Sequence, residues 1–307
     1  MTTVKKNGSR SMDENVTPPD EAAKIAQLRE ALGPLSSRAA IFCTDDCLHR
    51  FLRARNFNVK KSEKMLRECL KWRASYKPEE IKWDDVAEEA ITGKVYRASF
   101  SDKWGGTVII MRPGNQNTSD QPGQIKHLVH NLENAIINLP PGQEQMVWLV
   151  DFKGWTVRKS IPVGTVREVA YVLQTMYPER LKFAVLYDPP RIFEGFWLLV
   201  KPFLDPKTFK KVKFVYTSKP ESVKLVDELF DLDVLEVPFG GRNPKLYNHQ
   251  DYANRMKLDD AKTAAFWKLD EPDVSSIKLD AQGKDPSKEN HVKDTSIAAA
   301  PEAAQTA

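Results

Sequence analysis

Short apolar runs alternate with helix-like stretches through the middle of this chain. The runs have the length and the Gly, Pro or charged boundaries of buried strands, and they predict strands at Thr107–Met111, Met146–Asp151, Leu181–Asp188 and Val212–Tyr216. Apolar residues at helical spacing predict helices at Ile125–Asn138, Val163–Met176 and Val223–Phe230. Strands that alternate with helices indicate βαβ units. The predicted fold class is therefore α/β with a mainly parallel sheet.

The region before these strands reads as helices only. One predicted helix covers Asp20–Leu32, a second is capped by Asp45-Asp46, and a third is capped by Ser62 and runs to Tyr76. We expect a small all-helical unit over 20–90, an α/β domain over 91–250 and a helical extension over 251–269. The ends, 1–19 and 270–307, are polar, charged or alanine-rich and bury too little apolar surface to order themselves. We predict that both are disordered tails.

The most apolar segment is a predicted helix after Pro189-Pro190, which suit a first helical turn. Its apolar residues wrap most of its circumference: Ile192, Phe193, Phe196, Trp197, Leu198, Leu199, Val200, Phe203 and Leu204. Arg191 and Lys201 bracket its central part. Such a helix is normally buried on all sides or faces lipid, and at about a dozen residues it is too short to span a bilayer. Two readings stay open at this point, a core helix and a helix that lines a ligand cavity.

Composition sets limits on the remaining possibilities. The chain has 307 residues, of which 41% are hydrophobic, enough for a sizeable core. It has no run of about 18 apolar residues and no apolar stretch near its start, so we expect neither a membrane anchor nor a signal peptide. Three cysteines without CxxC spacing favour neither a disulfide framework nor a zinc site. The predicted location is the cytosol.

Candidate chemistry is sparse. His127 and His130 could share a helix face as metal ligands, but no partner lies at ligand spacing, so a surface pair is favoured and no metal is expected. The chain has no G-x-S-x-G elbow, G-x-G-x-x-G turn, phosphate loop or H-E-x-x-H helix. We therefore predict a protein that is not an enzyme and has no cofactor.

Charge is uneven along the chain. The net charge is +4, but the segment 270–307 holds eight acidic residues against four lysines, which leaves +8 for the rest. A basic body suits an anionic membrane surface. Without a recognition motif or a basic stripe interleaved with aromatic residues, nucleic acid is not an expected partner. A solvated basic face with no partner is an equally simple reading.

Three motifs carry a family resemblance: Tyr177-Pro178-Glu179-Arg180, Lys201-Pro202-Phe203-Leu204-Asp205-Pro206 and Phe239-Gly240-Gly241. Together they resemble the CRAL-TRIO lipid-binding family, most closely its phosphatidylinositol-transfer proteins, over roughly Thr44 to Pro244. The resemblance implies a CRAL-TRIO fold, in which a mainly parallel sheet and helices form a hydrophobic lipid cavity.

The resemblance also implies a site for the inositol phosphate headgroup. The family's F-L-R-A-R, Y-P-E-R and L-D-P motifs correspond here to segments that supply Arg55, Glu179, Thr208 and Lys211. Each residue also has an ordinary alternative role: a helix C-terminal charge, a loop salt bridge, a cap and a solvated strand residue, respectively. Four matches in separate motifs favour a common headgroup site.

A carrier of phospholipid also needs an apolar gate. Transfer of about thirty methylenes into water costs more than about 20 kcal/mol, so the acyl chains must be enclosed. We assign gating and membrane contact to the helix around Trp197, through Arg191, Ile192, Phe193, Phe196, Trp197, Val200 and Lys201. The predicted function is phosphatidylinositol binding and its transfer or presentation, by a protein that associates peripherally with membranes. The alternatives are a carrier of a sterol-like, tocopherol-like or retinoid-like ligand and, less favoured, a lipid-modifying enzyme.

The sequence departs from the family at one group of positions. Family members that exchange phosphatidylcholine use two tyrosines and a Ser/Thr pair, where this chain has Ala98, Ile109, Met146 and Trp148. None of these residues donates a hydroxyl, which argues against phosphatidylcholine exchange by the same geometry. The sequence therefore leaves open whether a second ligand is another lipid or a sterol-like molecule, or whether there is none.

Overall fold

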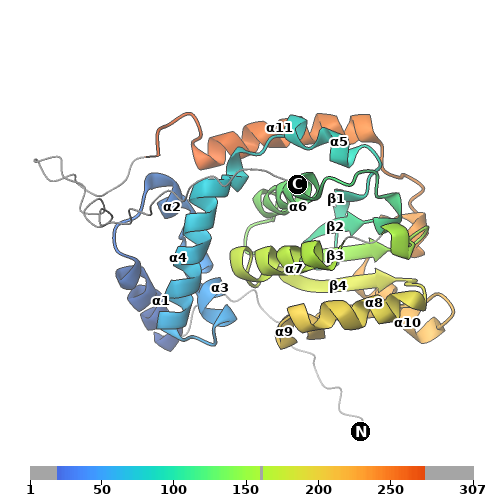
Figure 1. The fold of residues 1–307 in the computed structure, drawn as a ribbon, viewed down its shortest axis with the longest axis horizontal. Coiled ribbons are helices and arrows are strands. Elements are labelled where there is room, and N and C mark those ends of the chain that lie inside the picture. Colours follow the sequence, from blue (N-terminus) through green and yellow to red (C-terminus); the bar gives the residue numbers. More distant parts are fainter. Residues whose placement is uncertain (1–18, 160–161, 274–307) are drawn as a thin grey trace, which may run out of the picture.

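Helices near the N-terminus form a unit beside the sheet. The computed structural model describes residues 19–159 and 162–273 (Figure 1). The unit consists of α1 (Pro19–Leu32), α2 (Ser37–Phe42), α3 (Asp45–Ala54) and α4 (Val59–Tyr76). Apart from Pro19 and residues 270–273, the predicted disordered tails lie outside the described residues. The helical unit agrees with the prediction, although α2 was missed.

The N-cap residues of two predicted helices were misplaced. The side chain of Thr44 accepts a hydrogen bond from the backbone N–H of Cys47 and so caps α3. Asn58 caps α4 by accepting from the N–H of Lys61. Ser62, which was expected to start α4, is buried inside it and donates to the carbonyl of Phe51. Side chains that bond to the backbone suit both roles, so sequence alone did not distinguish them.

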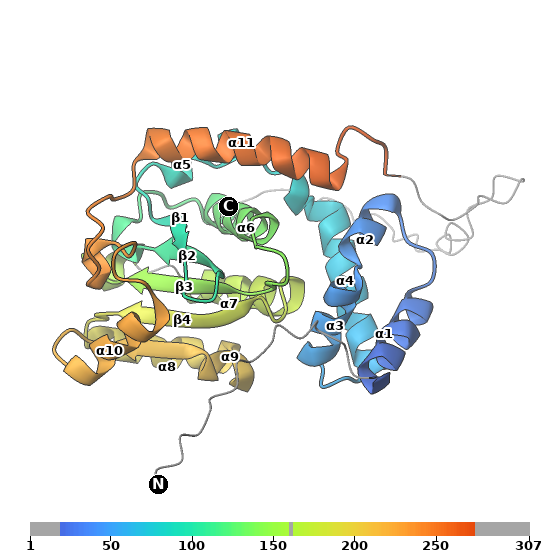
Figure 2. The same cartoon turned by 180° about the vertical axis from the view of Figure 1, so that it is seen from behind.

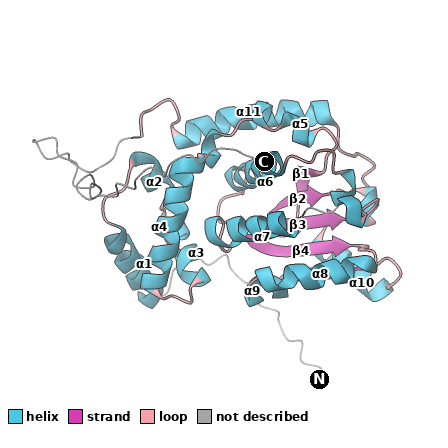
Figure 3. Cartoon of the chain, viewed as in Figure 1, coloured by secondary structure: helices cyan, strands magenta, loops and turns pink. Residues whose placement is uncertain are grey.

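A five-stranded sheet forms the centre of the larger part of the molecule (Figure 3). Its strands, in spatial order, are β1 (Val95–Ser101), β2 (Thr107–Met111), β3 (Met146–Asp151), β4 (Leu181–Tyr187) and β5 (Val212–Val215). All neighbours pair in parallel except β1 and β2, which are antiparallel. The prediction of a mainly parallel sheet is confirmed. It missed β1 because this partly exposed edge strand lacks the continuous apolar run of a central strand.

Helices cover the two faces of the sheet differently. On one face lie α6 (Gln121–Ile137), α7 (Val163–Tyr171) and α8 (Ile192–Val200), and on the other lies α10 (Pro220–Leu229) (Figures 1 and 2). Alternate residues of β3 point to opposite faces. Val147 and Leu149 join the main core, whereas Trp148 and Val150 line a pocket beneath α7 and α8. The short helices α5 (Ala87–Ala90) and α9 (Pro206–Lys210) lie in the connections.

Two predicted helices change geometry near their C-terminal ends. The segment predicted as one helix from Val163 becomes a π-helical turn at Val172–Met176. The very apolar helix ends at Val200 and continues as a 3₁₀ turn, Lys201–Phe203, rather than as α-helix to Leu204. It is also not buried all round, because Phe193 is buried while Leu198 is 67% exposed. No helix in the described part of the chain is long and apolar enough to cross a membrane.

The long helix α11 (His249–Trp267) lies along the open edge of the sheet and reaches the helical unit (Figure 1). Its Tyr252 hydroxyl accepts from the backbone N–H of Arg97 on the edge strand β1 at 2.9 Å. Its Arg255 donates to the carbonyl oxygens of Arg97 and Ala98. These bonds satisfy backbone groups that an uncovered edge would expose.

The prediction that His127 and His130 form a surface pair is wrong. His127 and His130 are only 1% and 4% exposed. Both lie on α6, and α11 covers part of this helix, which the sequence reading did not foresee. Burial lowers the pKa of His127 to about 3, and nearby His130 and Lys94 add to the effect. Among the described residues, no group of three or more His, Cys, Asp or Glu side chains is arranged to hold a metal ion.

Candidate ligand-binding site

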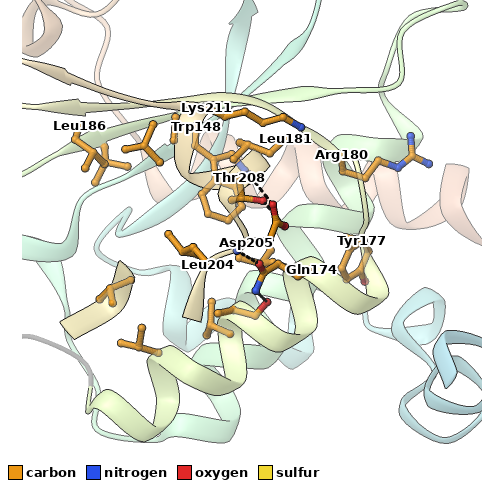
Figure 4. Close-up of a pocket in the computed structure, with 18 of the residues that line it drawn as sticks. Trp148, Gln174, Tyr177, Arg180, Leu181, Leu186, Leu204, Asp205, Thr208 and Lys211 are labelled. Carbon is orange, nitrogen blue, oxygen red and sulfur yellow. Dashed lines mark hydrogen bonds between the residues drawn. The ribbon is translucent and has the colours of Figure 1, made fainter. Parts of the chain in front are cut away.

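A pocket of about 670 Å³ lies between the sheet and the helices α7 and α8 (Figure 4). Most of its wall is apolar. The strands contribute Met146, Trp148, Val150 and Leu186, the α7 side contributes Val166, Val169 and Leu173, and α8 contributes Phe193, Phe196, Trp197 and Val200. An apolar cavity with a few converging polar groups is the usual form of a site for a hydrophobic ligand.

The four residues assigned to the headgroup all line this one pocket: Arg55, Glu179, Thr208 and Lys211. They come from the end of α3, the loop before β4, α9 and the residue after α9. The fold therefore brings together side chains that are up to 156 positions apart in sequence, since 211 minus 55 is 156. Their role in binding a headgroup remains a prediction.

Glu179 and Lys211 form an ion pair inside the pocket wall. The distance from Lys211 Nζ to Glu179 Oε2 is 3.2 Å, and both side chains are partly buried. Glu179 has a φ of +58°, in the left-handed region, which costs energy for a residue other than glycine. Gln145 donates from Nε2 to the backbone carbonyl of Glu179 at 3.1 Å and supports this conformation. Strained backbone that is held in place by its surroundings is frequent at binding sites.

Asp205 organises the start of α9. Its carboxylate accepts from the backbone N–H groups of Lys207 and Thr208 at 2.7 and 2.9 Å. It also accepts from the Thr208 hydroxyl at 2.9 Å. Thr208 is thus fixed in place by the cap but is not the cap itself, and its hydroxyl oxygen keeps acceptor capacity for another donor.

Two other basic side chains, Arg55 and Lys207, line the same pocket. The Arg55 side chain makes one hydrogen bond, to the carbonyl of Ala54, and has no carboxylate within salt-bridge distance among the described residues. Lys207 donates to the Arg53 carbonyl and to Asn56 Oδ1 at 3.0 and 2.8 Å, and so links α9 to the helical unit. A guanidinium without a carboxylate partner at a pocket wall is suited to bind a phosphate.

Arg180 follows Glu179 but its side chain points away from Thr208 and Asp205 (Figure 4). Its guanidinium donates to the Glu144 carbonyl at 2.9 Å. Burial and then the neighbouring Arg50 lower the pKa of Arg180 to about 10, so it stays charged at neutral pH. Tyr177, earlier in the same motif, donates from its hydroxyl to Glu133. All four residues of the Tyr-Pro-Glu-Arg motif line the pocket, but the polar ends of Tyr177, Glu179 and Arg180 bond to different partners.

The residues assigned to the gate divide into two groups. Phe193, Phe196, Trp197 and Val200 line the pocket, whereas Arg191, Ile192 and Lys201 do not. Ile192 is 61% exposed, and Arg191 and Lys201 are also exposed. Phe193 packs into an aromatic cluster with Phe152 and Trp155, with ring centroids 4.4 and 5.6 Å away.

The four positions aligned with the phosphatidylcholine-binding hydroxyls also divide. Met146 and Trp148 line the pocket. Ala98 and Ile109 are buried in the main core instead. Sequence reasoning also missed Gln174, Asp205 and Lys207 as members of the pocket wall. The Asp205-Pro206 pair is a recognisable helix start, but no sequence pattern marks the π-helical turn that carries Gln174.

Comparison with known proteins identifies the class to which this fold and pocket belong. The family model of the CRAL/TRIO domain matches residues 91–241, and that of the CRAL/TRIO N-terminal domain matches residues 21–68. The chain belongs to the CRAL/TRIO family of lipid-binding proteins.

Individual relatives refine this picture. A phosphatidylinositol transfer protein of Saccharomyces cerevisiae, PDR17, is 31% identical over 251 residues, which cover 76% of this chain and 68% of the relative. The SEC14 cytosolic factor of Candida glabrata is 31% identical over 244 residues, 73% of this chain and 79% of the relative. A CRAL-TRIO domain-containing protein of Schizosaccharomyces pombe is 36% identical over 212 residues, but the match spans only 20% of that protein.

A solved structure is similar in fold. The crystal structure of Sfh5 superposes with a TM-score of 0.64 and 16% sequence identity, and the match covers 84% of this chain and all of the Sfh5 chain.

Proposed function

We propose that this protein binds phosphatidylinositol, encloses its acyl chains in the pocket and transfers the lipid between membranes or presents it to another protein. The observation that carries the proposal is that Arg55, Glu179, Thr208 and Lys211 all line one mostly apolar pocket, in which Glu179 and Lys211 are in direct contact. The relatives named phosphatidylinositol transfer protein and SEC14 cytosolic factor support it. The proposed location is the cytosol, with transient association at membrane surfaces.

The headgroup chemistry follows from the residue types. Arg55 and Lys211 supply charge for a phosphodiester, and charge-assisted hydrogen bonds are the stronger class. Glu179 accepts hydrogen bonds from inositol hydroxyls, and the Thr208 hydroxyl both donates and accepts. Lys211 pairs with Glu179 at 3.2 Å. A bound headgroup would share both partners rather than leave either charge buried alone.

Helix α8 is the proposed gate. Its inward side chains are apolar and line the pocket, and its outward side chains include exposed Leu198 and Leu199. Arg191 and Lys201 flank the helix, where they would meet phosphates at a membrane surface. Opening at the bilayer would exchange protein contacts for lipid contacts, so the acyl chains would not cross water.

Removal of both members of the internal ion pair tests the headgroup site. We expect Lys211→Ala combined with Glu179→Ala to reduce phosphatidylinositol transfer between vesicles by at least tenfold, because two charge-assisted contacts are lost. The matched control is Lys257→Ala with Asp84→Ala, an exposed pair with the same 3.2 Å separation. Transfer at the wild-type rate by the Lys211 and Glu179 double variant would refute the site.

Lipid occupancy tests the broader proposal. Protein purified from a eukaryotic host is analysed by native mass spectrometry and lipid extraction. Phosphatidylinositol as the main bound lipid is the expected result. A sterol, tocopherol or retinoid instead would favour the alternative carrier function, and an empty pocket would contradict lipid carriage.

A further inference from the structure

Gln174 makes hydrogen bonds across the pocket wall that the family resemblance does not account for. It lies in the π-helical turn Val172–Met176 that follows α7. Its Oε1 accepts from the backbone N–H of Asp205 at 2.6 Å, and its Nε2 donates to the Phe203 carbonyl at 2.7 Å (Figure 4 draws the first of these). Nε2 also donates to the Ala170 carbonyl at 3.0 Å within its own helix. Single π-helical turns within helices occur frequently at functional sites.

The two backbone groups that Gln174 contacts belong to different functional segments. Phe203 ends the 3₁₀ turn that directly continues α8. Asp205 caps α9, and its carboxylate holds both the N–H and the hydroxyl of Thr208. One side-chain amide therefore bonds to the end of the proposed gate and to the start of the segment that carries Thr208 and Lys211.

The remaining attachment of α8 is of a different kind. At its N-terminal end, Phe193 packs between Phe152 and Trp155. Along the helix, no side chain that the structure describes makes a hydrogen bond, and Trp197 stacks on Phe209 with ring centroids 5.9 Å apart. At the C-terminal end of this helix, the hydrogen bond from Gln174 Nε2 to the Phe203 carbonyl therefore adds a directional polar contact to the apolar ones.

We propose that Gln174 is a latch that couples the gate to the headgroup segment. The inference rests on the proposed function. Movement of α8 away from the sheet displaces the Phe203 carbonyl and breaks the bond from Nε2. The amide then loses the geometry in which Oε1 also accepts from Asp205, so Thr208 loses part of its support. Opening of the gate and loosening of the headgroup contacts become one step, and Gln174 acts as a positioning residue for both.

Amide hydrogen exchange tests the latch without any lipid. We expect Gln174→Met, which nearly keeps the side-chain volume but removes all three side-chain hydrogen bonds, to speed exchange at Asp205 about five- to tenfold, the effect of losing the one bond to the Asp205 N–H. Gln124→Met is the matched control, because Gln124 is also a partly buried glutamine that donates to a backbone carbonyl, that of Thr118, but it does not line the pocket. The control is expected to leave exchange at Asp205 unchanged.

Lipid release tests the coupling. The full chain is loaded with fluorescent phosphatidylinositol and mixed with excess acceptor vesicles. We expect Gln174→Met to release the lipid about five- to tenfold faster than wild type, and Gln124→Met to release it at the wild-type rate.

The variant Gln174→Glu separates the hydrogen bond that Gln174 accepts from Asp205 from the bonds that it donates to Phe203 and Ala170. A carboxylate still accepts from the Asp205 N–H but cannot donate to the Phe203 carbonyl. We therefore expect protected exchange at Asp205 together with fast lipid release. Slow release by this variant would show that the bond to Phe203 does not hold the gate.

The outcomes distinguish the latch from the proposed function. Unchanged exchange at Asp205 and unchanged release in Gln174→Met would overturn the latch while phosphatidylinositol binding stands. Failure of the wild-type chain to take up phosphatidylinositol would overturn the proposed function, and the exchange measurement would still report on the hydrogen bonds of Gln174.

Discussion

Helices α11 and α8 both cover parts of the sheet, but they are attached by different chemistry. α11 is held by polar bonds: Asp259 accepts from Arg97 at 2.6 Å and from Asn134 at 2.9 Å, and Tyr252 accepts from the β1 backbone. α8 is held mainly by aromatic contacts around Phe193. Directional polar bonds must be replaced by water when they break, whereas apolar contacts are exchanged for lipid contacts at little cost, because lipid tails are as apolar as leucine. This difference in attachment is what the proposed function requires, in which α8 moves as the gate while α11 stays in place.

The largest expected effect is on the stability of the α11 side. Asp259→Ala leaves the partly buried Arg97 guanidinium without its carboxylate. Such a loss costs about 3 kcal/mol of unfolding free energy, measurable by urea denaturation. Leu198→Ala on α8, which is 67% exposed, should stay within about 0.5 kcal/mol of wild type. Equal losses in the two variants would remove the distinction between the helices.

Acid should act on the same side of the molecule through His127. Its pKa is lowered from 6.5 to about 3 in the folded protein, so below pH 6.5 the unfolded chain binds a proton that the folded chain does not. Stability therefore falls as pH falls through this window. Between pH 7 and pH 5 the contribution is about 2 kcal/mol.

The variant His127→Leu isolates this contribution. Between pH 7 and pH 5 the unfolding free energy, measured by urea denaturation, should fall by about 2 kcal/mol less in His127→Leu than in wild type. Parallel pH profiles for the two proteins would mean that His127 is not the responsible group.

The smallest expected effect is on the affinity of α8 for membranes. Leu198→Asp should weaken binding to vesicles of phosphatidylcholine and phosphatidylserine roughly tenfold, because a carboxylate at the interface carries a desolvation cost. The matched control is Leu258→Asp on α11, where the leucine is 75% exposed. If both variants bind alike, α8 is not the surface that meets the membrane.

Much of the fold was predictable because central strands have a strong pattern. Strands β2, β3 and β4 are buried on both faces, which makes them continuous apolar runs, and their predicted bounds lie within one residue of those observed. The edge strand β1 and the helix α2 were missed, since partial burial leaves a mixed pattern that resembles a loop. The position of Gln174 in a π-helical turn was not predictable, because the turn is decided by packing rather than by propensity.

The sequence by itself determined strands β2 to β5 of the sheet, the very apolar helix near Trp197 and the residue types that resemble a headgroup site. Only the tertiary structure decided which face of α8 lines the pocket, that His127 is buried, and that Arg55, Glu179, Thr208 and Lys211 line one pocket. The physical reason is that local pattern reports how apolar a segment is, whereas burial and contact depend on which distant segment packs against it. That choice is made by the whole chain when it folds.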